Sequence, residues 1–374
     1  MNVLFAIGAC GATLFLAGVL HEPITPLIAT MAVLIAIASS IRPVRKTRVS
    51  IVDLALIIPI LAVIVAACVI PLHDFDGRAF WMLKAKGIAH DQSIEGPFFQ
   101  RGEMDAPRND YPLLMPLDAA TIMHFSGSLD DRLPRWLYVA VFVAFAWMVR
   151  EELGGWAAAL LVWIPAISVM PDGGATSAYC DIALGAFACG AFFEAVRGES
   201  AWRFGAWVAF VAFTKREGLP LALVLLVMGI FAFRKRIASG LIAPVIAIVS
   251  LIVWRARVAP GDEENLFTLA STLPEKLHRI PGAIAGLARH TVAPVWALFW
   301  CAALVALIVL ALRRQWRDFT LASLVIGGGL AISIVAYTAT NWRQIDLINS
   351  SADRLLIHIV GPALYAMRRS TLPT

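Results

Sequence analysis

Long apolar runs separated by short polar stretches recur along the whole chain. A transmembrane helix needs about 20 mainly apolar residues to cross roughly 30 Å of hydrocarbon, and several runs approach that length. The pattern predicts an all-α, polytopic membrane helix bundle with about 11 to 13 membrane segments, some of them half-helices or tilted. The candidate segments are residues 3–20, 24–41, 51–72, 112–127, 137–149, 156–171, 182–196, 204–213, 219–233, 237–254, 291–312, 319–337 and 355–366.

The composition agrees with this pattern. The chain of 374 residues is 60% hydrophobic and 15% charged, with a mean hydropathy of +0.77. A soluble core cannot hide that much apolar sequence, so the composition excludes an ordinary soluble protein. The five cysteines are odd in number, form no CxxC pair and lie in or beside apolar runs, which indicates neither a disulfide framework nor a zinc site.

The net charge of +5 is interpreted as a topology signal, with no nucleic-acid partner, because the basic residues cluster in short loops. Cytoplasmic loops of membrane proteins are rich in Lys and Arg, so these clusters are assigned to the cytoplasm. Residues 73–111, 255–290 and 338–354 then fall on the external face. The clusters are Arg42, Arg45, Lys46 and Arg48; Arg234, Lys235 and Arg236; Arg313, Arg314 and Arg317; and Arg368 with Arg369.

This assignment requires one of the segments 112–127, 137–149 and 156–171 not to cross fully. The run 137–149 has only about half the length of a full span and is the favoured one. A helix break near Thr214–Gly218 is also predicted, because one long helix over 204–233 would bury Lys215 and Arg216 near mid-bilayer at about 2.5 to 3.5 kcal/mol each. Residues 1–50 are expected to form an N-terminal helical hairpin, and residues 51–374 a membrane core that includes the loop 73–111.

The first external loop carries the clearest candidate chemistry. An apolar run ends in two acids, Asp74 and Asp76, and Lys84 follows at a helix-compatible spacing from Asp76. Ionisable groups that converge at a membrane rim are costly to keep, so a functional site is the default hypothesis for them. Phe80 and Trp81 are expected to anchor the loop in the membrane interface.

The predicted helix break supplies a second group of candidates. Lys215 and Glu217 stand beside Arg216 between two short apolar stretches. Cations held at membrane depth are expensive unless they bind an anion, and a lipid phosphate would provide one. An ordinary cytoplasmic loop is the alternative interpretation of these residues.

Further candidates lie in a short polar loop and at the start of the last apolar segment. Tyr179 and Asp181 follow a Gly-Gly turn, where an acid that merely ends a helix is equally consistent. Arg354 and His358 are four residues apart and therefore share a helix face, where they can grip a phosphate. A lone arginine at this place would instead extend to the lipid headgroups.

Taken in order, these motifs resemble the GT-C superfamily of integral membrane glycosyltransferases, in particular bacterial relatives of the protein mannosyltransferases and lipid A aminoarabinose transferases. The similarity covers most of the chain from about residue 51. It rests on Asp-x-x-x-x-Trp with Lys-Ala-Lys from Asp76, Asp-Tyr-Pro-Leu-Leu at 110–114, Tyr-x-Asp at 179–181, Thr-Lys-x-Glu-Gly at 214–218 and Asp-Arg-Leu-Leu-x-His at 353–358. The resemblance implies a catalytic acid in the first large external loop and a sugar donor linked to a polyprenyl phosphate.

The resulting hypothesis is inverting transfer of the sugar to a hydroxyl of a cell-envelope glycan or lipid, at the external face of a bacterial inner membrane. Asp76, or Asp74 in its place, acts as general base, while Lys215, Arg354 and His358 hold the leaving phosphate. No metal is required, although magnesium or manganese bridging the two aspartates is compatible with the arrangement. The alternatives are a transporter or flippase of a lipid-linked or anionic solute, and an O-antigen ligase or polymerase.

Overall fold

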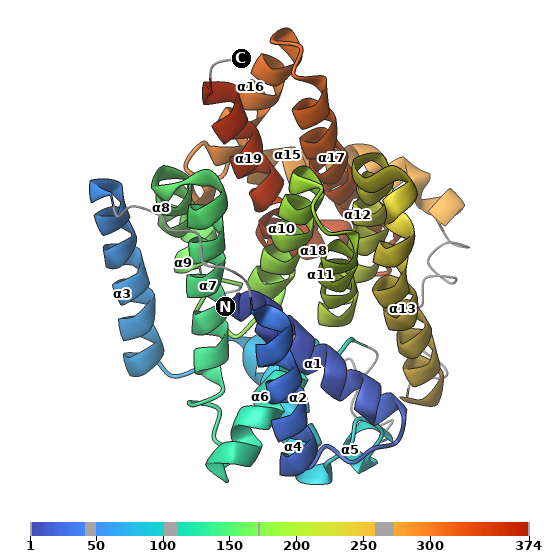
Figure 1. The fold of residues 1–374 in the computed structure, drawn as a ribbon. Helices are drawn as coiled ribbons and strands as arrows, with labels where there is room; N and C mark the ends of the chain where they lie inside the picture. The colour runs from blue at the N-terminus through green and yellow to red at the C-terminus, as the bar shows by residue number, and fades with distance from the viewer. Residues whose placement is uncertain (1, 42–49, 101–110, 171–172, 259–272, 373–374) are drawn as a thin grey trace.

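The chain folds as a bundle of helices (Figure 1). The computed structural model describes residues 2–41, 50–100, 111–170, 173–258 and 273–372. Helices account for 82% of the structure, and none of the described residues lies in a strand. The predicted all-α fold is therefore confirmed.

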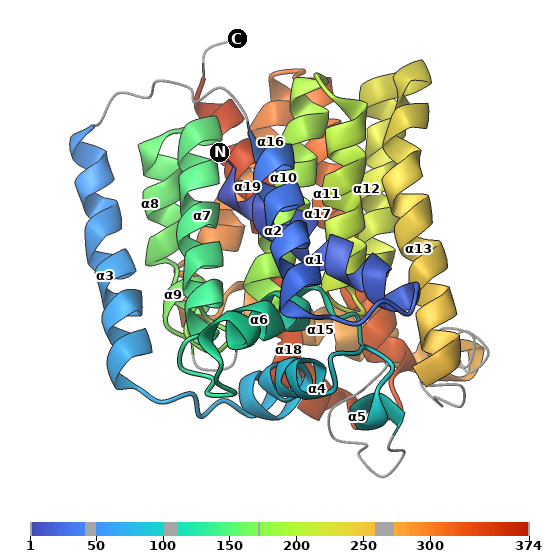
Figure 2. The ribbon, with the colours of Figure 1, turned by 60° about the horizontal axis from the view of Figure 1, so that its bottom comes forward.

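Three helical stretches in the described ranges are long and apolar enough to cross a membrane, namely Ile51–Val69, Gly218–Val258 and Trp316–Ala339. The second of these turns back on itself as α12 (Gly218–Phe233), η3 (Arg234–Ile237) and α13 (Ala238–Val258) (Figure 2). Shorter apolar helices accompany them. These lengths and compositions indicate a membrane helix bundle.

The N-terminal part and the following loop contain short as well as long helices. The segment Ile51–Val69 comprises η1 and α3, and α3 stands at the edge of the bundle (Figure 1). The elements in chain order are α1 (Val3–Val19), α2 (Pro26–Ser40), η1 (Ile51–Asp53), α3 (Leu54–Val69), η2 (Gly77–Met82), α4 (Leu83–Asp91), α5 (Pro97–Gln100) and α6 (Leu114–Ser126).

The rest of the chain forms most of the upright helices of the bundle. The elements before α12 are α7 (Arg135–Leu153), α8 (Gly155–Trp163), α9 (Pro165–Ser168), α10 (Asp181–Arg197) and α11 (Ala201–Thr214). The elements after α13 are η4 (Leu277–Arg279), α15 (Ile280–Thr291), η5 (Pro294–Trp296), α16 (Phe299–Leu312), α17 (Trp316–Ala339), α18 (Gln344–Ile357) and α19 (Val360–Thr371).

The bundle has two chemically different ends (Figure 2). The basic end, at the top of the view, carries η3, the α16–α17 connection and the C-terminal turn of α19, and so three of the four basic clusters. The loop end, at the bottom, carries η2, α4, α5, α15 and α18. The fourth cluster, Arg42 to Arg48, lies outside the described residues. The three described clusters therefore share one end, as the sequence predicted.

Helices α6 and α7 differ in how they lie in the bundle, while the expectation that 137–149 does not cross the membrane stays a prediction, because neither helix is among the three stretches able to span one. Helix α7 has 19 residues and runs along the height of the bundle, whereas α6 has 13 residues and lies beside α4 at the loop end (Figure 2). Helix α7 extends beyond its apolar run because its charged last turn is paired. Arg150 donates to Asp53 with two bonds of 2.7 Å, and Glu152 accepts from Arg197.

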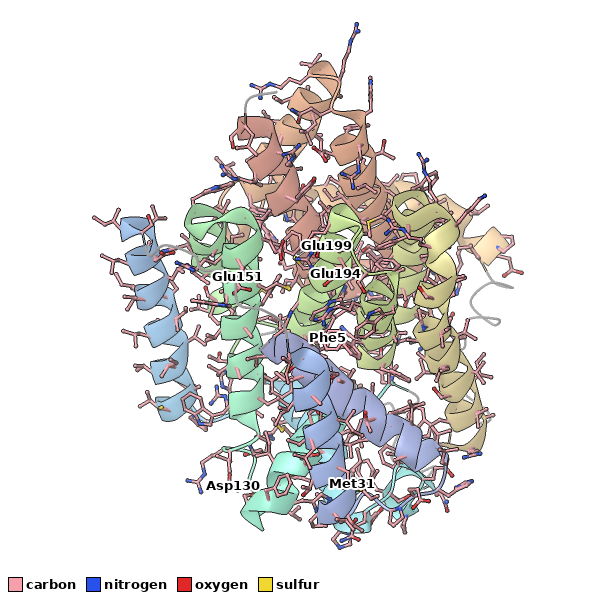
Figure 3. The ribbon with its side chains drawn as sticks, viewed as in Figure 1. Phe5, Met31, Asp130, Glu151, Glu194 and Glu199 are labelled. Carbon is pink, nitrogen blue, oxygen red and sulfur yellow. The ribbon has the colours of Figure 1, made fainter. Side chains whose placement is uncertain are left out.

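Acidic side chains offset part of the positive charge toward the basic end. Glu151, Glu194 and Glu199, labelled in Figure 3, lie in the upper half of the molecule, while Asp130 lies near its lower end. The buried carboxylate of Glu194 contacts Arg197 at 2.7 Å and Arg203 at 3.5 Å. Paired charges of this kind allow helix ends to carry arginines where the bundle buries them.

The predicted helix break is confirmed. Helix α11 ends at Thr214 and α12 begins at Gly218, so the chain reverses direction over Lys215, Arg216 and Glu217. Gly218 allows the two helices to approach closely, since a Cβ at this position would overlap the carbonyl oxygen of Val211. The reversal places Lys215 at the loop-side end of α11.

We expect Gly218→Ala to lower the free energy of unfolding by about 2 kcal/mol, because the backbones of α11 and α12 must separate to accommodate the methyl group. The measurement is the thermal unfolding midpoint in detergent. Gly327→Ala is the matched control, since a Cβ there would have no atom within 4 Å. Equal midpoints for the two variants would contradict the close approach.

Candidate functional site

The site is built around an ion pair that joins an early segment of the chain to a late one. The Arg354 Nη1 atom donates to Asp76 Oδ2 at 2.7 Å, across 278 residues of chain. Asp76 immediately precedes η2, a π-helical turn, and Arg354 lies in the last turn of α18. The predicted meeting of the early aspartate with the distant cation is therefore present in the structure.

A second, more deeply buried group adjoins this pair. Asp181 Oδ1 accepts from Lys215 Nζ at 2.9 Å and lies 3.0 Å from His358 Nε2. Asp181 is the first residue of α10, Lys215 directly follows α11 and His358 directly follows α18. Three helix ends thus bring a carboxylate, an amine and an imidazole together, and all three side chains are buried. Glu217 adds a carboxylate oxygen 3.6 Å from Lys215 Nζ.

Tyr179 connects Asp76 and Arg354 at a single side chain. Its hydroxyl accepts from the backbone N–H of Asp76 at 3.3 Å, and its ring lies under the Arg354 guanidinium, 4.9 Å from ring centroid to Cζ. Gly173 makes room for the arginine stem, because a Cβ there would lie 2.7 Å from Arg354 Cγ. Gly173 also has a φ of +123°, which favours glycine.

The opposite charges in the site stabilise each other's ionised forms. Burial works to lower the pKa of the Arg354 guanidinium, but the nearby Asp181 and Asp76 carboxylates outweigh it and hold that pKa above its ordinary value. Arg354 therefore stays positively charged. Positive and negative side chains alternate through the site, so an anionic ligand would have to share or displace existing partners.

Lys84 lies in an aromatic cage near Lys215, since Tyr111 of the cage also interacts electrostatically with Lys215. Its Nζ atom lies 5.4 Å from the ring centroids of Phe80 and Trp81 and 5.3 Å from that of Tyr111. The lysine is completely buried, and Trp81 is only 2% exposed. The expectation that Trp81 anchors the loop in the membrane interface is therefore wrong, because its ring packs against this cation instead.

Asp74 is buried two residues before Asp76, and its carboxylate lies within the electrostatic field of Arg135. No group of three His, Cys, Asp or Glu side chains within the described ranges is arranged to hold a metal ion. A metal bridging Asp74 and Asp76 stays a hypothesis. The motif residue Asp110 lies outside the described residues.

Arg135 supports the site in a way that the sequence did not reveal. Its guanidinium donates to the carbonyl of Thr176 at 2.9 Å, to that of Ala67 at 3.3 Å and to that of Ile70. It therefore joins the end of α3, which leads to Asp76, to the loop that leads to Tyr179. Nothing in its local sequence marks this role, because all three acceptors are backbone atoms distant in the chain.

Helix α18 is also held by contacts that local sequence does not show. Asp353, next to Arg354, lies 3.0 Å from His290 Nδ1 and accepts from Trp296 Nε1 at 2.9 Å. Tyr337 contacts Ser351 through their hydroxyls at 3.2 Å. These side chains from α15, η5 and α17 fix the turn of α18 that presents Arg354. In the sequence, only the position of Asp353 next to Arg354 indicated that it could support this site.

Comparison with known proteins finds no matching family model, no similar curated protein and no similar solved structure. The site therefore rests on its own geometry.

We expect Arg135→Met to destabilise the protein by about 3 kcal/mol, since it leaves buried backbone carbonyls without their charged donor. Thermal unfolding in detergent measures this loss, and limited proteolysis should show faster cleavage around residues 70–76 and 174–178. Arg132→Met is the control, because Arg132 is exposed and pairs with Asp130 on the surface. A loss no larger than that of the control would refute the supporting role.

Proposed function

We propose that this protein is a membrane glycosyltransferase that moves a sugar from a polyprenyl-phosphate donor to a hydroxyl of a cell-envelope glycan or lipid. The observation that carries the proposal is the contact between Asp76 and Arg354 beside Lys215, Asp181 and His358. A general base and a set of phosphate-binding cations are the two parts that such a transfer needs. A carboxylate and a group of cations suited to these two roles lie within one site.

In the proposed reaction, Asp76 takes the proton of the acceptor hydroxyl while the acceptor oxygen bonds to the anomeric carbon of the sugar. The bond between that carbon and the donor phosphate oxygen breaks, and the polyprenyl phosphate leaves with the bonding electrons. Attack opposite the leaving group inverts the anomeric configuration. The base is regenerated when Asp76 releases its proton to water.

The cations act on the leaving group. Arg354 presents a planar fork of donors suited to phosphate oxygens, and Lys215 adds a compact charge behind it. His358 lies in the same group through Asp181, so its imidazole is held at a fixed distance from the amine. These groups stabilise charge as it develops on the departing phosphate, which lowers the barrier to transfer.

The surroundings suit a lipid-linked donor. The site lies toward the loop end, with apolar helices that can contact a polyprenyl chain beside it. The basic end lies opposite, so the positive-inside rule would place the site on the external face of the membrane. A bacterial inner membrane, with the site toward the periplasm, is the proposed location.

Asp76→Asn should reduce transfer by about 10²- to 10⁴-fold, because the amide cannot accept the acceptor proton. The assay uses purified protein, a panel of polyprenyl-phosphate sugars and envelope glycan extracts, with mass spectrometry detecting the new glycosidic bond. Asp130→Asn makes the same change of charge on an exposed turn and should retain activity. Turnover of Asp76→Asn near that of wild type would exclude Asp76 as the base, and movement of the donor without a new bond would favour a transporter.

A further inference from the structure

The proposed base, Asp76, and one of the proposed phosphate-binding cations, Arg354, are paired with each other in this structure. Asp76 Oδ2 accepts from Arg354 Nη1 at 2.7 Å, with 30% of the aspartate side chain and 14% of the arginine side chain exposed. A carboxylate lone pair that accepts from a guanidinium is occupied and cannot take a proton at the same time. In the observed arrangement the guanidinium therefore engages a lone pair of Asp76 Oδ2, and it must leave before that lone pair can accept a proton.

We infer that Arg354 exchanges partners during the reaction. Without donor, its guanidinium holds Asp76; when the donor phosphate arrives, the guanidinium turns to the phosphate and releases Asp76 to accept the proton of the acceptor. This inference rests on the proposed function and adds to it the order in which donor binding and release of the base occur. The donor binds first, and the guanidinium frees Asp76 Oδ2 only afterwards.

Arg354 is better suited to this exchange than Lys215. Lys215 contacts two carboxylates, Asp181 at 2.9 Å and Glu217 at 3.6 Å, and its side chain is only 7% exposed. Among the described residues, Arg354 has one carboxylate within salt-bridge distance, and its Nε donor has no hydrogen bond there. Moving Lys215 would leave Asp181 without its amine, whereas moving Arg354 breaks the ion pair with Asp76 and leaves the hydrogen bond between Lys215 and Asp181 in place.

The stack of Arg354 on Tyr179 allows movement at low cost. A guanidinium lying over a ring can turn within its own plane and keep the cation–π contact. The glycine at position 173 leaves the space beside the arginine stem free of a side chain. The guanidinium can therefore turn away from the carboxylate while its stem stays packed against Gly173.

Tyr179 also keeps the base in place while its partner changes. Its hydroxyl accepts from the Asp76 backbone N–H at 3.3 Å, a contact that does not involve the Asp76 carboxylate. When Arg354 departs, this hydrogen bond still fixes the position of the aspartate. Tyr179 therefore contacts Arg354 through its ring and holds the Asp76 backbone through its hydroxyl.

The test measures binding of farnesyl phosphate, a short polyprenyl phosphate, by isothermal titration calorimetry in detergent. Because the wild type must break the Asp76–Arg354 pair to bind phosphate, Asp76→Asn and Asp76→Ser should bind farnesyl phosphate about tenfold more tightly than wild type. A general base that contacts no phosphate would show no such gain. Asp130→Asn controls for the loss of one negative charge at the same end and should bind as wild type does.

Arg354→Gln should bind about tenfold more weakly than wild type, and adding Asp76→Asn to it should bring no gain, since the gain depends on the arginine. Thermal unfolding in detergent identifies the folded variants to be scored. Unchanged or weaker binding by the folded Asp76 variants, or an equal gain in the Arg354→Gln background, would overturn the exchange.

These outcomes separate the exchange from the proposed function. If the wild type transfers sugar but the Asp76 variants do not bind farnesyl phosphate more tightly, the proposed transferase function stands and the partner exchange of Arg354 is rejected. If the Asp76 variants bind farnesyl phosphate more tightly but no polyprenyl-phosphate sugar is transferred, the partner exchange of Arg354 stands and the transferase function is rejected.

Discussion

The pairing of Asp76 with Arg354 is the contact on which the arrangement of the loop end depends. It joins the segment after α3 to α18, two parts of the chain separated by 278 residues. Burying either charge alone would carry a large desolvation penalty, so each needs the other wherever the helices shield them from water. The same constraint explains why Lys215, Asp181 and His358 form a single buried group.

The surrounding helices hold these charges at fixed positions. Asp181, Lys215 and His358 lie at helix ends, where the chain reverses and side chains from different helices can converge. Arg135 and Asp353 add polar contacts that secure the two segments carrying Asp76 and Arg354. The apolar helices provide the frame, while a small set of hydrogen bonds to backbone and side chains decides where the functional groups lie.

A resting site whose charges are already paired has consequences for chemistry. An incoming phosphate meets cations that are engaged, so its binding must rearrange at least one ion pair. If the site is a transferase, this requirement links arrival of the donor to release of the base. Arg354 is the group best placed to make that link, because it contacts a carboxylate on one side and an aromatic ring on the other.

The amino-acid sequence by itself determined the helical class, the break at Lys215 and the shared end of the described basic clusters. These follow from local properties, namely the length of apolar runs, the cost of burying cations and the position of charge between runs. In the sequence pattern the run 137–149 has about half the length of a span, whereas α7 has 19 residues, because its charged last turn is paired through Arg150 with Asp53 and through Glu152 with Arg197. Only the tertiary structure decided that Trp81 encloses Lys84, that Arg135 supports two loops and that Asp76 is held by Arg354, because each of these contacts joins atoms whose proximity depends on packing.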